Sequence, residues 1–198
     1  MVRTIAKDHD EKRGQILKAA AKIFATEGFD RASMTQLAQE CGISKANIYH
    51  YYGGKDAILF DILDNYLSTL RNRIVALDFR GKSATDRLRE TIVEILRAYQ
   101  GSDHEHQVQI NGFATLPEDQ QATIRSYQRD LVRFLSDRID EAAPETFAND
   151  RGKLRAVTMS VFGMLNWFFM WNGEADATAR DDYADLVARL TLKGLPGL

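Results

Sequence analysis

The sequence predicts an all-α protein, with a three-helix head that contains a helix-turn-helix, followed by a larger helical bundle. Apolar residues recur at spacings of three and four along most of the chain, which is the period of an amphipathic helix. No segment alternates apolar and polar residues between turn signals, as a half-buried strand would. The 198 residues are 44% hydrophobic and include only 3 prolines, so the chain has enough apolar material for a core.

The first two helices of the head are expected over residues 10 to 27 and 34 to 41. The apolar face of the first consists of Ile16, Ala19, Ala20, Ile23 and Phe24. Gly28 suits the C-terminal stop of that helix. Ser33 and Gln36 have the Ser-x-x-Gln spacing of a capping box, in which each side chain bonds a free backbone N–H of the first turn.

A third, short helix is expected from Ser44, its N-cap, to Tyr51. Gly42 ends the preceding helix, and Gly53 and Gly54 break the chain after the third. Two short helices joined by Cys-Gly-Ile-Ser match a helix-turn-helix, in which a glycine allows the sharp angle between the helices.

The third helix exposes an unusual set of side chains. We expect Leu37 and Ala38 to pack beneath it and only Ile48 and Tyr52 to point inward. The positions left to face outward are Lys45, Ala46, Asn47, Tyr49, His50 and Tyr51. The alternative is an aromatic-rich helix that packs against the bundle.

Outward donors and flat groups suit a helix that lies in the DNA major groove. Asn47 can bond an adenine edge and Lys45 can reach guanine, while Ala46 is small enough to approach a thymine methyl. Tyrosine and histidine suit phosphate and sugar contacts. Lys55 begins the next helix, where its charge and the free N–H groups both attract phosphate.

The rest of the chain predicts a bundle of five or six longer helices. They are expected over about 55–74, 84–99, 117–139, 150–171 and 178–193, with a short helix over about 104–112. The segment SVFGMLNWFFMW, at the end of 150–171, is apolar on more than one face.

Charge is uneven along the chain. Residues 1 to 55 hold nine lysines and arginines against six acidic residues, and the remainder holds 17 against 22. A mildly positive head on an acidic body suits an anionic partner at one end. Cys41, the only cysteine, has no partner for an intramolecular disulfide; we interpret it as a small buried residue and expect a cytoplasmic location. No apolar run reaches the roughly 18 residues that span a bilayer, so no membrane association is expected.

No catalytic, metal or cofactor site is expected. His104 and His106 point to different sides of a helix, so we interpret their segment as a solvated loop or helix start rather than a metal site. The Gly-Gly-Lys at 53–55 lacks the spacing of a phosphate-binding loop. No Ser/His/Asp or Cys/His set is evident, so the protein is not expected to be an enzyme.

Residues 12 to 63 contain the segment ILKAAAKIFATEGFDRASMTQLAQECGISKANIYHYYGGKDAIL. Through this segment they resemble the TetR family of bacterial regulators. It implies a DNA-binding domain over residues 1–54 and a ligand-binding, dimerising domain over 55–198. The residues that match DNA-contacting positions are Thr35, Ser44, Lys45, Ala46, Asn47, Tyr49, His50, Tyr51 and Lys55. Tyr52 stands where phenylalanine is commoner. Asn47 stands where Gly, Thr or Ser is more usual, so we expect it to make a base contact particular to this protein.

The tail from VFGMLNWFFMW onward is similar to TetR regulators that sense CoA thioesters, including phenylacetyl-CoA-responsive repressors. The pocket residues implied are Phe113, Tyr127, Phe162, Met164, Asn166, Trp167, Met170 and Trp171, with Arg125, Arg129 or Arg133 for the CoA phosphates. Methionines and aromatics form an adaptable apolar lining, and Asn166 could bond a thioester carbonyl. Alternatively, Phe162, Trp167 and Leu186 bury against a second subunit.

The resemblance therefore implies a homodimeric transcriptional repressor that binds a palindromic double-stranded operator. An acyl-CoA effector such as phenylacetyl-CoA would move the helix that begins at Lys55 and change the separation of the two recognition helices. The alternatives are a regulator that answers to another hydrophobic molecule or, as a global or architectural DNA binder, to none. A helical-bundle enzyme acting on CoA esters is a further alternative, for which the tail offers only Asn166.

Overall fold

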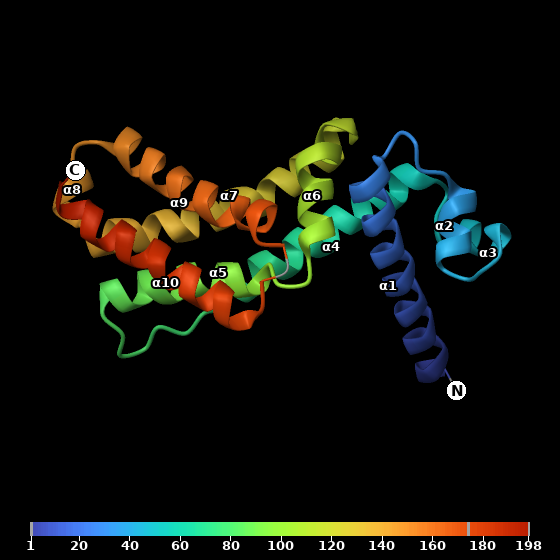
Figure 1. Ribbon diagram of the computed structural model, residues 1–198, viewed down its shortest axis with the longest axis horizontal. Helices are drawn as coiled ribbons and strands as arrows, with labels where there is room; N and C mark the ends of the chain where they lie inside the picture. Colours follow the sequence, from blue (N-terminus) through green and yellow to red (C-terminus); the bar gives the residue numbers. More distant parts are fainter. Residues whose placement is uncertain (1, 174, 198) are drawn as a thin grey trace. The chain divides into compact units, whose positions relative to one another are not determined.

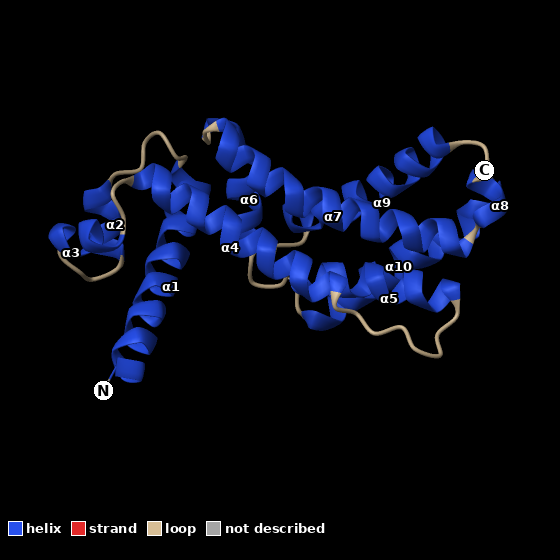
Figure 2. Cartoon of the chain, turned by 180° about the vertical axis from the view of Figure 1, so that it is seen from behind, coloured by secondary structure: helices blue, strands red, loops and turns tan. Residues whose placement is uncertain are grey.

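The computed structural model describes residues 2–173 and 175–197, and its described part contains helices and no strand (Figures 1 and 2). The all-α prediction is confirmed. The helices are α1 (Val2–Glu27), α2 (Met34–Glu40), α3 (Lys45–Tyr51), α4 (Lys55–Val75), α5 (Ala84–Ala98), α6 (Asp103–Gly112), α7 (Glu118–Ala142), α8 (Pro144–Phe147), α9 (Arg151–Trp171) and α10 (Ala177–Gly194), with short 3-10 turns η1 (Phe113–Thr115) and η2 (Leu195–Gly197).

Helix α1 begins eight residues earlier than the sequence predicts, at Val2 instead of residue 10. It ends as expected, because Gly28 has a φ of 90°, a conformation that suits glycine, and its N–H donates to the Phe24 carbonyl at 3.1 Å.

Only half of the expected capping box forms at the start of α2. Ser33 Oγ accepts a hydrogen bond from the Gln36 N–H at 3.2 Å. The Gln36 amide does not reach back, and instead donates to Glu27 Oε1 at 2.6 Å. Glu27 is the last residue of α1, so this bond joins two helices.

The turn between α2 and α3 follows the predicted helix-turn-helix. Gly42 has a φ of 62°, and Ser44 Oγ caps α3 by accepting from the Asn47 N–H at 3.1 Å. Leu37 and Ile48 are buried between the two helices, which pack against each other. Cys41, the C-cap of α2, is half-buried rather than fully buried, and burial raises the pKa of its thiol.

The predicted longer helices are all present, and one short helix was missed. Helix α8 is a single turn with Pro144 at its start and the fully buried Phe147 at its end. Four residues are too few to show a helical period, so only the buried ring reveals why this turn forms.

Contacts divide the chain into two compact units. The first takes the chain up to Leu67 together with His104–Arg125, and the second takes Ser68–Asp103 with the chain from Ser126 onward. Helix α4 contributes to both. The predicted boundary after residue 54 separates a DNA-binding domain from a ligand-binding domain, which is a division by function and not by contacts. It stays a prediction.

In the second unit, α5 and α10 lie side by side and run antiparallel (Figures 1 and 2). Arg97 donates two hydrogen bonds of 2.7 Å to Asp181, and Arg89 pairs with Asp185 at 2.8 Å. Apolar residues of α5, including Leu88, form part of the core.

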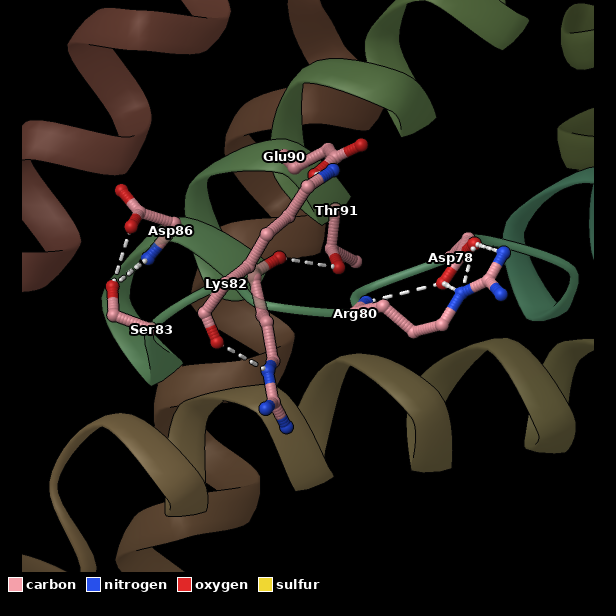
Figure 3. Close-up of polar contacts among 8 residues, drawn as sticks. Asp78, Arg80, Lys82, Ser83, Asp86, Glu90 and Thr91 are labelled. Atoms are coloured by element: carbon pink, nitrogen blue, oxygen red, sulfur yellow. Dashed lines mark hydrogen bonds and ion pairs between the residues drawn. The ribbon is translucent and has the colours of Figure 1, made fainter.

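Local polar contacts order the loop between α4 and α5 (Figure 3). Asp78 accepts from the backbone N–H of Arg80 at 3.1 Å and also pairs with its guanidinium. Ser83 Oγ caps α5 by accepting from the Asp86 N–H at 3.2 Å. The start of α5 is therefore fixed by its own sequence.

Candidate functional site

Helix α3 presents the side chains that the sequence predicts on its outward face. Lys45, Ala46, Asn47, Tyr49 and His50 are exposed, whereas Ile48 is fully buried. Thr35 of α2 is exposed as well. The cap at Ser44 uses the backbone N–H of Asn47, so it does not engage the Asn47 amide. These exposed side chains are small, polar or aromatic, and their contact with DNA stays a prediction.

Tyr51 is held in place by a residue that the sequence reasoning missed. Its ring is half-buried and stacks on His9 of α1, with ring centroids 4.8 Å apart. His50 meets the same ring edge-on at 5.8 Å. His9 lies before the segment that carries the family resemblance, so no motif indicated it.

Lys55 makes a set of contacts that the sequence did not indicate. Its ammonium donates to the carbonyls of Phe29 at 2.8 Å, Asp30 at 3.0 Å and Ala32 at 3.4 Å. It also lies 4.5 Å from the centroid of the Phe29 ring. An ammonium group has three donors, so Lys55 holds the loop between α1 and α2. A phosphate contact would require exchange of one of these bonds and stays a prediction.

A partly buried polar cluster joins α1, α4 and the end of α3. Asp61 accepts hydrogen bonds from the guanidinium of Arg13, one of them 2.9 Å long, and from the hydroxyl of Tyr52. Burial and the bond to Asp61 raise the pKa of Tyr52 above its ordinary value. Tyr52 is the C-cap of α3. The hydroxyl that distinguishes Tyr52 from the commoner phenylalanine therefore links α3 to α4.

The predicted effector residues fall in both compact units. Phe113 and Arg125 belong to the first, where the Arg125 guanidinium lies 5.3 Å from the Phe113 ring centroid. The others belong to the second unit: Tyr127, Arg129, Phe162, Met164, Asn166, Trp167, Met170 and Trp171.

Within the second unit, part of this set is interior. Phe162 is buried, and Met164, Tyr127 and Asn166 are half-buried. The Asn166 side-chain oxygen accepts a hydrogen bond from the buried Tyr99 hydroxyl at 2.7 Å. That bond leaves the amide donors of Asn166 for a carbonyl group.

The rest of the set lies at the surface. Trp167, Met170 and Trp171 of α9 are 57%, 53% and 59% exposed. Arg129 and Arg133 are exposed on α7. The placement of Trp167 and Met170 favours an interface over the interior of this chain, whereas Trp171 also packs edge-on against Phe168 and Tyr183.

The histidine-containing segment is helical, and His106 is buried rather than solvated. Its Nδ1 lies 3.0 Å from the Tyr66 hydroxyl. No group of three or more His, Cys, Asp or Glu in the described part of the chain is placed to hold a metal ion. Likewise, no helix of residues 2–173 and 175–197 is long and apolar enough to cross a membrane.

Two family models match the chain. The model for bacterial regulatory proteins of the tetR family matches residues 16–62. The model for the tetracyclin repressor-like C-terminal domain matches residues 81–195, which is more than half of the chain.

Individual relatives agree with these matches. The HTH-type transcriptional regulator HbdR of Aromatoleum sp. (strain CIB) is 42% identical over 65 residues, 33% of this chain and 28% of the relative. Two further curated relatives are covered over only 25% and 29% of their length. A TetR-family transcriptional regulator from Bordetella parapertussis 12822 has 30% identity and a TM-score of 0.85, over 94% of this chain and 96% of the other.

The structure of AibR in complex with isovaleryl coenzyme A and operator DNA has a TM-score of 0.74 over 91% of this chain and 98% of the other. Its identity of 21% shows a shared fold alone. Because one family model covers the helix-turn-helix and the other covers most of the remaining chain, this protein belongs to the tetR family of bacterial regulatory proteins.

Proposed function

We propose that the protein is a homodimeric, DNA-binding transcriptional repressor that a small effector releases from a palindromic operator. The observation that carries this proposal is the outward face of α3. Lys45, Asn47, Tyr49 and His50 are exposed there on a capped helix of which only Ile48 is buried. Such a helix can enter the major groove with its N-terminal residues toward the bases.

Dimerisation is supported by an apolar face on α9 and α10, two helices that pack against each other. Its exposed residues are Met159, Trp167 and Met170 of α9 and Leu186 and Leu190 of α10. Gly163, exposed among them, has open space where a Cβ would stand, which permits close approach of a second helix. A large exposed apolar patch marks an interaction surface, and two-fold pairing supplies the second recognition helix that a palindrome needs.

An acyl-CoA is the effector class that we propose. The fold is shared with AibR, whose structure holds isovaleryl coenzyme A. Phe162, Met164 and Asn166 bring apolar surface and free amide donors to the inside of the second unit. Arg129 and Arg133 are exposed and available for phosphates. Because Trp167 and Met170 are exposed, the effector contacts the half-buried and buried members of the predicted set in the second unit, or it is a different hydrophobic molecule.

The effector releases the protein from DNA because it binds one conformer of the dimer more tightly than the other. The two α3 helices of a dimer must lie roughly 34–36 Å apart to enter successive major grooves. An effector that binds only a conformer with another separation shifts the population away from the DNA-bound form by its difference in affinity. Helix α4 is the element through which this change passes, because residues 55–67 belong to one unit and 68–75 to the other.

The test is binding of the purified protein to its own upstream DNA at one fixed salt concentration. We expect tight binding that is abolished by phenylacetyl-CoA or isovaleryl-CoA and unaffected by free coenzyme A. Tight binding that no thioester changes would retain the regulator and overturn the effector class. Equal affinity for upstream and random DNA would overturn the proposal itself.

A further inference from the structure

The second unit contains a buried cation with an incomplete set of partners. Arg180, in the first turn of α10, has a side chain that is only 3% exposed. Its nearest acidic group is Asp103, with the charged atoms 3.6 Å apart, which is beyond hydrogen-bond distance. Its Nε has no hydrogen-bond partner among the residues that the structure describes.

This arrangement is costly for a guanidinium. The group carries five N–H donors, and a buried charge is tolerated when it is paired and hydrogen-bonded. A second arginine of this unit, Arg97, is better paired although it is half-exposed. It donates two hydrogen bonds of 2.7 Å to Asp181 of α10. Arg180 therefore has an N–H donor that a better-placed anionic partner can engage.

An aromatic cluster adjoins this cation. The Arg180 guanidinium lies 5.5 Å from the centroid of the buried Phe168 ring. Tyr183 stacks on Phe168 at 4.8 Å, and Trp171 meets both rings edge-on at 5.1 and 5.2 Å. Since Trp171 is largely exposed, the cluster extends from the buried charge to the surface.

We propose that Arg180 binds the carboxylate of an aromatic carboxylic acid, whose ring packs against Phe168, Trp171 and Tyr183. A planar guanidinium matches the two oxygens of a carboxylate, and flat apolar side chains match an aromatic body. The proposal rests on the proposed function, since it names a class of effector for the same regulator. It differs in naming a free acid, and in placing the recognition of charge at a buried arginine instead of the exposed arginines of α7.

The acid enters by taking the place of Asp103. The Asp103 side chain is 33% exposed, so the guanidinium can be approached from that side. One carboxylate then replaces another beside Arg180, and Asp103 moves into water. The charge beside the buried guanidinium is unchanged by the exchange.

The residue that the acid displaces, Asp103, lies where the chain passes from the second compact unit to the first. Asp103 is the first residue of α6, and the division between the two compact units falls directly after it. Binding at Arg180 therefore frees the residue at which the chain leaves the second unit.

The experiment compares benzoate with benzamide, its neutral counterpart, in calorimetric titrations of the full-length protein. We expect benzoate to bind and benzamide to bind roughly tenfold or more weakly, because hydrogen bonds to a charged group are lost. Inorganic phosphate is expected not to compete, since it has no ring for the aromatic cluster. Equal affinity for benzoate and benzamide, no binding of either, or competition by phosphate as strong as benzoate would overturn the proposal.

Two variants and a matched control locate the site. Arg180→Met keeps much of the length and apolar character of the side chain and should abolish benzoate binding. Asp103→Asn removes the competing charge and should tighten benzoate binding several-fold, an effect that a purely structural ion pair would not produce. Arg97→Met removes another Arg–Asp pair of the same unit and should leave the affinity unchanged. Loss of benzoate binding in Asp103→Asn, or equal loss in Arg97→Met, would contradict the assignment.

The DNA-binding assay separates this proposal from the proposed function. Benzoate binding that depends on Arg180 in a protein that does not recognise its upstream DNA would retain the site and overturn the regulator. Specific DNA binding that responds to a thioester, in a protein that does not bind benzoate, would retain the regulator and overturn the site.

Discussion

Asn47 combines exposure with a donor and an acceptor on one short side chain. Its backbone N–H completes the cap of α3, whereas its amide is not engaged by that cap. The backbone of α3 is thus fixed by a cap at the position from which this amide projects. An exposed amide at the start of a helix can read an adenine edge if that helix enters the major groove.

Replacing Asn47 with alanine should weaken binding to the best operator by about 1–3 kcal/mol and relax the preference for one base pair. Random DNA should be bound almost as well as by the wild type. Competition assays against a set of single-base operator variants measure both effects. Equal losses on operator and random DNA would remove Asn47 from the base contacts.

Tyr52→Phe should lower the free energy of unfolding by about 1 kcal/mol, because Asp61 loses a donor while Arg13 remains. The pKa of Tyr52 is raised in the folded protein. The contribution of its hydroxyl is therefore complete below the ordinary tyrosine pKa of about 10 and is lost as the pH rises above it. Urea unfolding of both proteins from neutral to alkaline pH tests this. A difference that grows above pH 10 would contradict it.

At the scale of elements, most helices and the turn between α2 and α3 were predictable, whereas contacts between residues distant in sequence were not. Periodic apolar faces identified the long helices, and capping residues identified the short helices α2 and α3. The four residues of α8 show neither signal. The capping box failed at Gln36 because Glu27, its actual partner, lies in another helix. The contacts of Lys55 and His9 also depend on residues distant in sequence, which local patterns do not show.

Lys55 connects the start of α4 to the loop that precedes α2, and it should contribute to stability even without DNA. Lys55→Ala should lower the free energy of unfolding by about 1–3 kcal/mol, since three carbonyls lose a charged donor. Denaturant unfolding measures this. If Lys55 also contacts a phosphate in the DNA complex, Lys55→Ala should reduce the slope of log binding constant against log salt concentration by about one unit. An unchanged slope would show that Lys55 binds the loop between α1 and α2 and does not contact a phosphate.

At the scale of the whole molecule, the exposed apolar residues of α9 and α10 are the surface through which we propose that two chains associate. The sequence identified Trp167 and Met170 as apolar residues that need a partner, but periodicity does not distinguish a ligand from a second subunit. The structure adds that both side chains are exposed in the single chain, which favours a second subunit as their partner. The burial of Arg180 on α10 was likewise not predictable, because the residues around it in the sequence do not indicate that its side chain is buried.

Leu190→Glu should convert the dimer to monomers, because it would place two unpaired charges in a two-fold apolar interface. Specific DNA binding should fall with it, while the helix content is retained. Ile110→Glu is the matched control, since Ile110 and Leu190 are 55% and 56% exposed. Sedimentation equilibrium measures the mass of each variant. A dimeric Leu190→Glu protein, or a monomeric Ile110→Glu protein, would place the interface elsewhere.

Cys41 offers a consequence of a different kind. It is the only thiol of the chain, and it lies half-exposed at the end of α2, within the helix-turn-helix. A dimer therefore carries one attachment point for a spin label on each head, without any mutation. Because burial raises the pKa of this thiol, labelling should proceed best in mildly alkaline buffer. Pulsed electron paramagnetic resonance on the labelled dimer would then measure the distance between the two spin labels, with and without operator or effector.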